Sequence, residues 1–197
     1  WKNSARDSAF DLTVFDQTLV LDTDLLISND KLLTCFNMSE DFMIANDYNL
    51  VNANTKINFD RVSDKTVPMF WATILYFTKS PTAKTVFDLV QHIKDSYNYY
   101  RLVYDITETK FRNDYAFSIA IHTMRGFVED CNWPLPIPGD MWVSTDKDIL
   151  VDIKDDSIQL LAQRDYDYLA VKLDNATTHV MNKFSLDQFI DKEFISE

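Results

Sequence analysis

Continuous runs of apolar residues along the chain predict buried strands. The runs are rich in aliphatic, β-branched and aromatic side chains, and polar turn residues separate them. Such runs are typical of strands that are covered on both faces of a sheet. We predict strands over 17–21, 25–27, 42–45, 68–77, 102–104, 149–151, 158–161 and 168–171.

Apolar positions at helical spacing predict amphipathic helices between these strands. One helix follows Ser80 and Pro81, which suit the N-cap and the first helical position. A second helix begins at Asn113 and Asp114, which we expect to cap it, because a carboxylate at a helix start complements the helix dipole. A last helix is expected over 186–194.

Strands that alternate with helices predict an α/β fold, with a sheet flanked by helices. The length of 197 residues suits one domain, and no repeat or linker divides the chain. The proportion of hydrophobic residues, 46%, excludes disorder for most of the chain. The chain has only two glycines, Gly126 and Gly139, and their separation excludes a glycine-rich phosphate loop.

The net charge of −12 makes nonspecific nucleic-acid binding unfavourable, because an acidic surface repels the phosphate backbone. No apolar run reaches the length of about 18 residues that a membrane span needs. The two cysteines, Cys35 and Cys131, form no disulfide framework and no zinc motif. Reduced thiols of this kind indicate a cytoplasmic protein.

The first candidate for chemistry is the pair Asp22 and Asp24, directly after an apolar run. Alternate residues of an extended chain project to one face, so both carboxylates would point the same way. Carboxylates this close repel each other unless a cation lies between them or one is protonated. Their oxygens suit Mg²⁺ or Mn²⁺, which in turn can neutralise a diphosphate. The alternative is two exposed loop aspartates in an acidic chain.

The second candidate is the segment from His179 to Lys183. If this segment is extended, the side chains of His179, Met181 and Lys183 lie on one face. A neutral imidazole can complete a carboxylate metal site, and a lysine can hold a phosphate as a point charge. The alternative is a half-buried histidine and a surface lysine. His92 and His122 lie on predicted helices without an acidic partner at ligand spacing, and we give them no role.

The third candidate is the start of the second helix, at Arg112, Asn113 and Asp114. Asp114 could accept hydrogen bonds from sugar hydroxyls, while Arg112 could pair with a phosphate or carboxylate. Asn113 belongs to the same binding segment. The alternative is a helix cap and nothing more.

Together these segments resemble the GT-A glycosyltransferases. The run from Phe15 to Ile27, with its Asp-Thr-Asp, is similar to the strand and Asp-x-Asp motif of that group. The segment Phe111 to Phe117 resembles the later acidic helix start that contacts the donor sugar, and His179 resembles the C-terminal histidine that closes the metal site in the glycogenin-like branch. The order and wide spacing of the segments match, and the resemblance spans most of the chain.

The resemblance implies a GT-A-like mixed sheet and metal-dependent transfer of a hexose or pentose from a UDP- or GDP-linked donor. Asp24 would ligate Mn²⁺ or Mg²⁺, Asp22 would reach the metal or the ribose, and His179 would be the third protein ligand. Asp114 would orient the donor sugar as the catalytic residue. A role for Lys183 in holding a phosphate is our inference from its charge and position.

In the GT-A fold the nucleotide-binding strands and helices precede the Asp-x-Asp motif. Only residues up to Leu21 precede it here, and the first residue is Trp1, so we expect residues 1–197 to be the C-terminal part of such a domain. The motifs do not specify the acceptor of the sugar; modified DNA bases in a virus-infected cytoplasm are one option. A non-catalytic interaction or structural protein that retains the fold is the main competing function, and a metal-dependent phosphoesterase is a weaker one.

Overall fold

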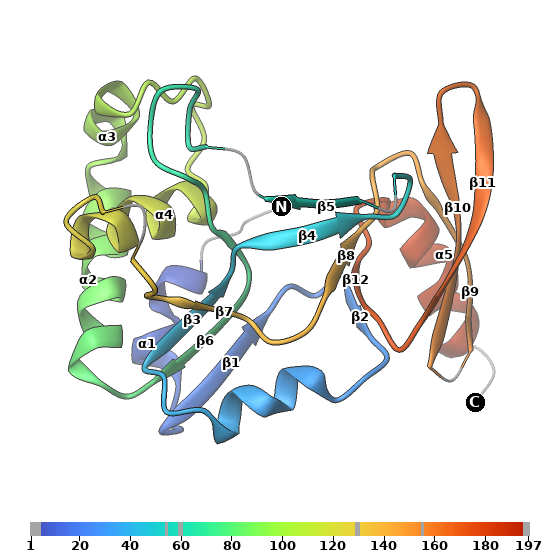
Figure 1. Ribbon diagram of the computed structural model, residues 1–197, viewed down its shortest axis with the longest axis horizontal. Helices are drawn as coiled ribbons and strands as arrows, with labels where there is room; N and C mark the ends of the chain where they lie inside the picture. The colour runs from blue at the N-terminus through green and yellow to red at the C-terminus, as the bar shows by residue number, and fades with distance from the viewer. Residues whose placement is uncertain (1–4, 54, 59–60, 129–130, 155, 195–197) are drawn as a thin grey trace. The chain divides into compact units, whose positions relative to one another are not determined.

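The computed structural model describes residues 5–53, 55–58, 61–128, 131–154 and 156–194, and it has the mixed α/β architecture drawn in Figure 1. The chain forms two compact units. Unit 1 comprises Trp1–Leu21, Cys35–Asn46 and Asn58–Ile137, and unit 2 comprises Asp22–Thr34, Asp47–Ile57 and Pro138–Glu197. The single domain over 1–197 stays a prediction.

A mixed sheet forms the centre of unit 1. Its order is β1 (Gln17–Leu21), β6 (Trp71–Thr78), β3 (Phe42–Ala45) and β7 (Leu135–Pro136). β6 pairs antiparallel with β1 and β3, whereas β3 and β7 are parallel. The six interior residues of β6 are all buried, because both faces of this strand are covered. This explains why its sequence is a continuous apolar run rather than an alternating one.

Helices cover one face of the unit 1 sheet. α2 (Pro81–Asp95) and α4 (Asn113–Met124) pack against each other, and α4 packs on β6. Phe42, Phe87 and Phe117 meet in this core. On the opposite face of this sheet, Met43 and Tyr76 pack with Cys35. Cys35 lies in the 3-10 helix η2 (Lys31–Asn37).

The shorter elements of unit 1 include one correction to the sequence prediction. The first elements of the described residues are the 3-10 helix η1 (Arg6–Ser8) and α1 (Ala9–Leu12), and α3 (Tyr97–Val103) follows α2. The strand predicted over 102–104 is therefore wrong, because helical backbone extends through Val103. The predicted cap of α2 is confirmed: Ser80 Oγ accepts a hydrogen bond of 3.1 Å from the Ala83 N–H, and Pro81 is the first helical residue.

Unit 2 contains a second mixed sheet. Its order is β2 (Leu25–Ile27), β12 (Thr177–His179), β8 (Met141–Val143), β4 (Asp47–Leu50) and β5 (Thr55–Asn58). β12 is antiparallel to β2 and parallel to β8, which is also parallel to β4. Of these strands only β2 is predicted from sequence. β4, β5 and β12 carry polar residues, and β8 is an isolated apolar triplet.

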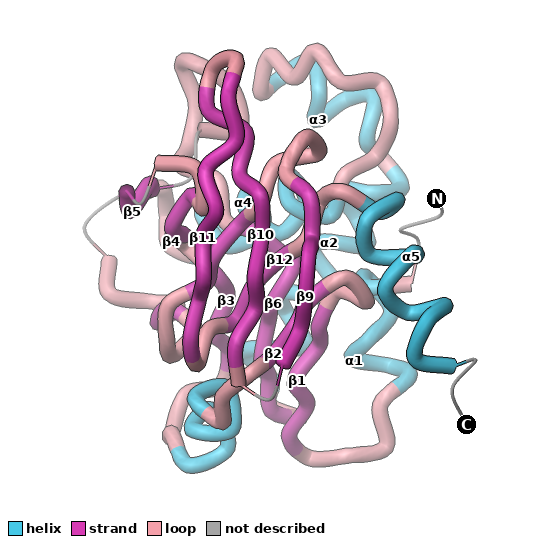
Figure 2. The backbone as a smooth tube through the Cα atoms, turned by 90° about the vertical axis from the view of Figure 1, so that its right-hand side faces the viewer, coloured by secondary structure: helices cyan, strands magenta, loops and turns pink. Residues whose placement is uncertain are grey.

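A three-stranded antiparallel sheet and the last helix complete unit 2. The strands are β9 (Ile149–Lys154), β10 (Ser157–Arg164) and β11 (Asp167–Asp174), and Figure 2 shows them side by side with α5 (Lys183–Phe194) next to β9. The inner face of this sheet supplies Ile158, Leu160 and Leu173 to a core that Leu186 of α5 joins. α5 begins three residues before the predicted 186–194. No helix among the described residues is long and apolar enough to cross a membrane.

Candidate functional site

Asp22 and Asp24 lie in a tight turn that leads into β2. The Leu25 N–H donates to the carbonyl oxygen of Asp22 at 3.3 Å. The predicted extended backbone is wrong, because the chain turns here. The turn still brings the two carboxylates together, as the prediction required. The turn leaves Asp22 half-buried and Asp24 only 3% exposed. A carboxylate buried to this degree needs a compensating partner.

The first partner of Asp24 is His179, the last residue of β12. Oδ1 of Asp24 lies 3.1 Å from Nε2 of His179, which is itself only 4% exposed. Backbone pairing holds the two together, since His179 is in register with Leu25 and the Val180 N–H donates to the Asp24 carbonyl at 3.0 Å. The sheet therefore fixes the distance between the imidazole and the carboxylate.

The second partner of Asp24 is Lys183, at the start of α5. Its Nζ contacts Oδ2 of Asp24 and donates a hydrogen bond of 3.0 Å to the Val180 carbonyl. The Asn182 side chain caps the helix, because its Oδ1 accepts from the Ser185 N–H at 3.1 Å. Burial lowers the pKa of Lys183 below its ordinary value, although the negative charges of Asp22 and Asp187 oppose this.

Asp22, Asp24 and His179 form a cluster that could hold a metal ion. Each offers one ligand atom, and these three atoms lie within 4.8 Å of one another. Oδ1 of Asp24 is buried, and among the described residues it makes no hydrogen bond beyond its 3.1 Å contact with Nε2 of His179, so a cation bound by both atoms would replace that contact. Two carboxylates and one imidazole are an oxygen-rich set with one nitrogen, which suits Mn²⁺ somewhat better than Mg²⁺. The residues present fit such an ion.

Asp114, the predicted catalytic residue, belongs to unit 1 and has two donors there. Its Oδ1 accepts a hydrogen bond of 3.0 Å from the Ala72 N–H, and its Oδ2 pairs with the Arg112 guanidinium at 2.8 Å. Arg112 also lies over the Tyr115 ring, 5.0 Å from its centroid. These contacts give the carboxylate a structural task, since it ties the start of α4 to β6. Its contact with a donor sugar stays a prediction.

The start of α4 differs from the predicted cap. The helix begins at Asn113, and Arg112 takes the N-cap position with an extended backbone and no side-chain cap bond. Asn113 is 1% exposed and Asp114 is 6% exposed. The expectation that Asn113 and Asp114 cap the helix is thus wrong, because Asp114 bonds across to β6 rather than to its own first turn.

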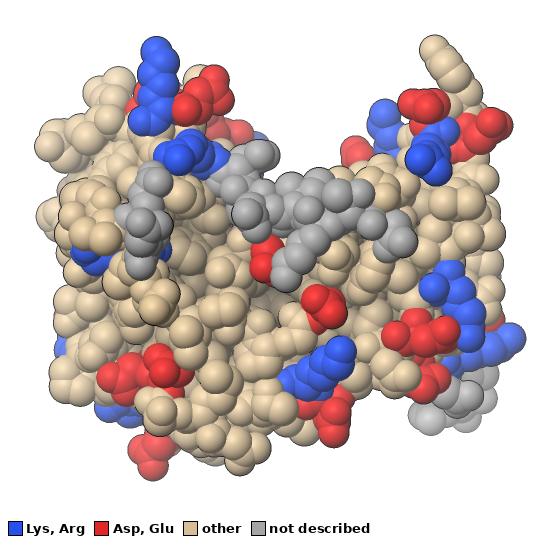
Figure 3. Space-filling view, viewed as in Figure 1, with Lys and Arg blue, Asp and Glu red and all other residues tan. Residues whose placement is uncertain are grey.

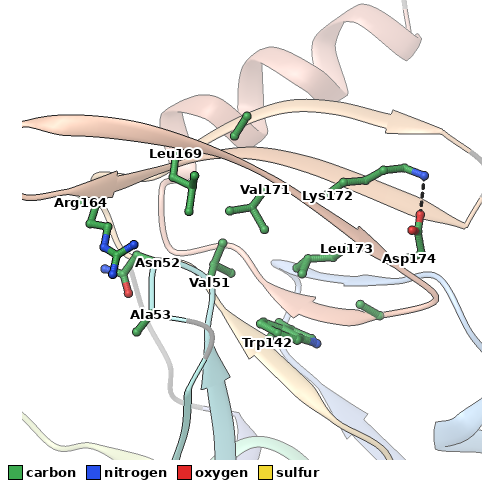
Figure 4. A pocket seen from close by; sticks show the side chains of 12 residues that line it. Val51, Asn52, Ala53, Trp142, Arg164, Leu169, Val171, Lys172, Leu173 and Asp174 are labelled. Atoms are coloured by element: carbon green, nitrogen blue, oxygen red, sulfur yellow. Dashed lines mark ion pairs between the residues drawn. The ribbon is translucent and has the colours of Figure 1, made fainter.

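Unit 2 also carries an open groove of about 480 Å³ that contains none of the predicted site residues. In Figure 4 the side chains of Leu169, Val171 and Leu173 extend from β11 toward Val51 and Trp142. Trp142 is in register with Thr178, so it projects from the opposite face of its sheet to His179. The sequence signal for the groove is the alternation of these apolar residues along β11, which by itself predicts only a strand.

Comparison of the sequence with protein-family models finds no match, and comparisons with curated proteins and with solved structures find no match either. The site itself is therefore the basis for a function. On the face drawn in Figure 3, basic side chains are interspersed with acidic ones instead of forming one continuous basic patch. The expectation that nucleic acid is not bound nonspecifically stays a prediction from the net charge.

Proposed function

We propose that the protein is a metal-dependent transferase that moves a sugar from a nucleotide-sugar donor to an acceptor. The observation that carries this proposal is the convergence of Asp22, Asp24 and His179, which come from opposite ends of the chain and bring their ligand atoms within 4.8 Å. The mixed sheets flanked by helices are compatible with a GT-A-like fold.

Each charged or ligating residue of the cluster would have a separate role in binding the ion or the donor. Asp24 and His179 would hold Mn²⁺ or Mg²⁺, and Asp22 would reach the ion or the donor ribose. When bound, the ion supplies positive charge that stabilises a departing diphosphate. Lys183 would add a second positive charge, because its ammonium already lies at the carboxylate of Asp24.

The donor side of the proposal involves the start of α4. Arg112 and Asn113 would contact the donor, and Asp114 would orient the sugar through hydrogen bonds to its hydroxyls. The exposure of Arg112 supports its proposed contact with the donor, since 44% of the side chain is exposed and its guanidinium can contact an anion. The ion pair with Oδ2 of Asp114 holds the guanidinium in position.

A hydrolysis screen against UDP- and GDP-linked sugars with Mn²⁺ tests the proposal, because transferases of this kind slowly transfer the sugar to water. We expect nucleotide release from at least one donor, and we expect Asp24→Asn to abolish it. Asp146→Asn, which changes an exposed carboxylate of unit 2, is the matched control and should keep full activity.

Two other outcomes would replace the proposal. If no donor binds or is cleaved while the protein remains folded, the chain is a non-catalytic interaction or structural protein. If phosphate is released from a simple phosphate ester in the presence of Mn²⁺, and no nucleotide sugar is cleaved, the same cluster serves a phosphoesterase.

A further inference from the structure

The ammonium of Lys183 lies on the same carboxylate that the metal site needs. Asp24 directs Oδ1 toward His179 and Oδ2 toward Lys183. A divalent ion bound by Asp24 would therefore lie within a few ångströms of a positive charge. Like charges at such a distance repel strongly where solvent is partly excluded, and the Asp24 side chain is only 4% exposed. The lysine and the ion are competitors for Asp24.

The position of Lys183 allows its ammonium to move away from Asp24. Lys183 is the first residue of α5, its side chain is 34% exposed, and four methylene groups carry its ammonium. The fixed parts of the site are different, because Asp24 and His179 are both buried and held by backbone pairing. The ammonium can thus swing toward solvent, whereas the carboxylate and the imidazole keep their positions.

We propose that Lys183 makes the binding of the divalent ion and of an anionic diphosphate ligand interdependent. This inference rests on the metal site of the proposed function. Without the anion, the lysine neutralises Asp24 and weakens the ion's binding. When a diphosphate is bound, the ammonium pairs with it and releases Asp24, so the ion binds more tightly. By linkage the ion strengthens binding of the diphosphate by the same factor.

Titration of chelator-treated protein with Mn²⁺ alone, followed by electron paramagnetic resonance of the free ion, gives the first test. We expect Lys183→Met to bind Mn²⁺ at least tenfold more tightly than the natural protein. Lys172→Met is the matched control, because Lys172 also pairs with an aspartate, Asp174 at 2.6 Å, but on the surface of the same unit. The control should change the affinity less than twofold.

A second titration measures the interdependence itself. With saturating UDP, and after correction for Mn²⁺–UDP complexes in the same buffer, the natural protein should bind Mn²⁺ at least tenfold more tightly than without UDP. In Lys183→Met this gain should vanish. Lys183→Arg keeps the positive charge and should keep part of the gain.

A double variant shows whether the effect passes through Asp24. In an Asp24→Asn background, Lys183→Met should no longer change Mn²⁺ affinity. If Lys183→Met binds Mn²⁺ no more tightly than the natural protein, or if neither binds it, the inference is wrong. If the predicted affinities are found but no nucleotide sugar is cleaved, the inference stands and the transferase proposal fails.

Discussion

Asp24 and His179 lie 3.1 Å apart between Oδ1 and Nε2, and both side chains are almost completely buried. The two residues come from opposite ends of the sequence and meet where β2 and β12 are paired. A carboxylate and an imidazole in this arrangement either pair with each other or share a cation. Substitution of the histidine separates these possibilities.

We expect His179→Ala to lower Mn²⁺ affinity by at least tenfold, because the cluster would lose its proposed nitrogen ligand. The matched control is His92→Ala, which removes an exposed imidazole from α2 and should leave the affinity unchanged. Isothermal titration calorimetry with Mn²⁺ measures both. An unchanged affinity in His179→Ala would restrict the role of the imidazole to packing and pairing with Asp24.

Asp114 can be tested for its structural task and its proposed catalytic task separately. Asp114→Ala removes the acceptor of the buried Ala72 N–H, and an unsatisfied buried donor costs about 1–3 kcal/mol. Asp114→Asn can keep that bond through its own Oδ1, so it should cost less of the free energy of unfolding. Urea unfolding curves measure the difference.

If Asp114 also orients the donor sugar, Asp114→Asn should lose most of the nucleotide-sugar cleavage although it stays more stable than Asp114→Ala. Full cleavage activity in Asp114→Asn would limit Asp114 to joining α4 and β6.

The two cysteines should differ sharply in reactivity. Cys35 is completely buried, and burial raises the pKa of its thiol to about 11. Since the thiolate is the reactive form, Cys35 should resist alkylation at pH 8 in the folded protein. Cys131 is half-exposed and should react first. Mass spectrometry after iodoacetamide treatment, with and without urea, locates the label; rapid labelling of Cys35 without urea would contradict the packing around η2.

The cap of α2 gives a prediction independent of any function. Ser80→Ala removes the acceptor of the Ala83 N–H and should lower the free energy of unfolding by about 1 kcal/mol. Ser80→Asp keeps an acceptor at this position and should restore the stability. A decrease of equal size in both variants would show that the cap bond does not stabilise the helix.

Local patterns predict the elements whose own residues carry a clear hydrophobic pattern. β6 is a long apolar run, and α2 combines a cap with apolar positions at helical spacing, so both can be predicted from sequence. The triplet 102–104 misleads because three apolar residues fit a strand or the end of a helix equally well. Its Leu102 is exposed in α3, which no periodicity over three residues could show.

The strands of unit 2 show which elements a local sequence pattern does not predict. β12 has only three residues, two of them threonine, and it is a strand because β2 and β8 pair with it on either side. Partners so distant in sequence leave no local signal. The approach of His179 to Asp24 depends on this pairing, so residue types indicate the candidates and the sheet supplies their geometry.

The chain that builds unit 2 comes in three separate stretches, and the candidate ligands are divided between the first and the last of them. An ion held by Asp24 and His179 would therefore cross-link two parts of the polypeptide that are distant in sequence. Part of its binding free energy would then appear as resistance of these strands to opening. Hydrogen exchange at β2 and β12 would then slow when the ion is bound, and the cation would stabilise this sheet in addition to its proposed role in the reaction.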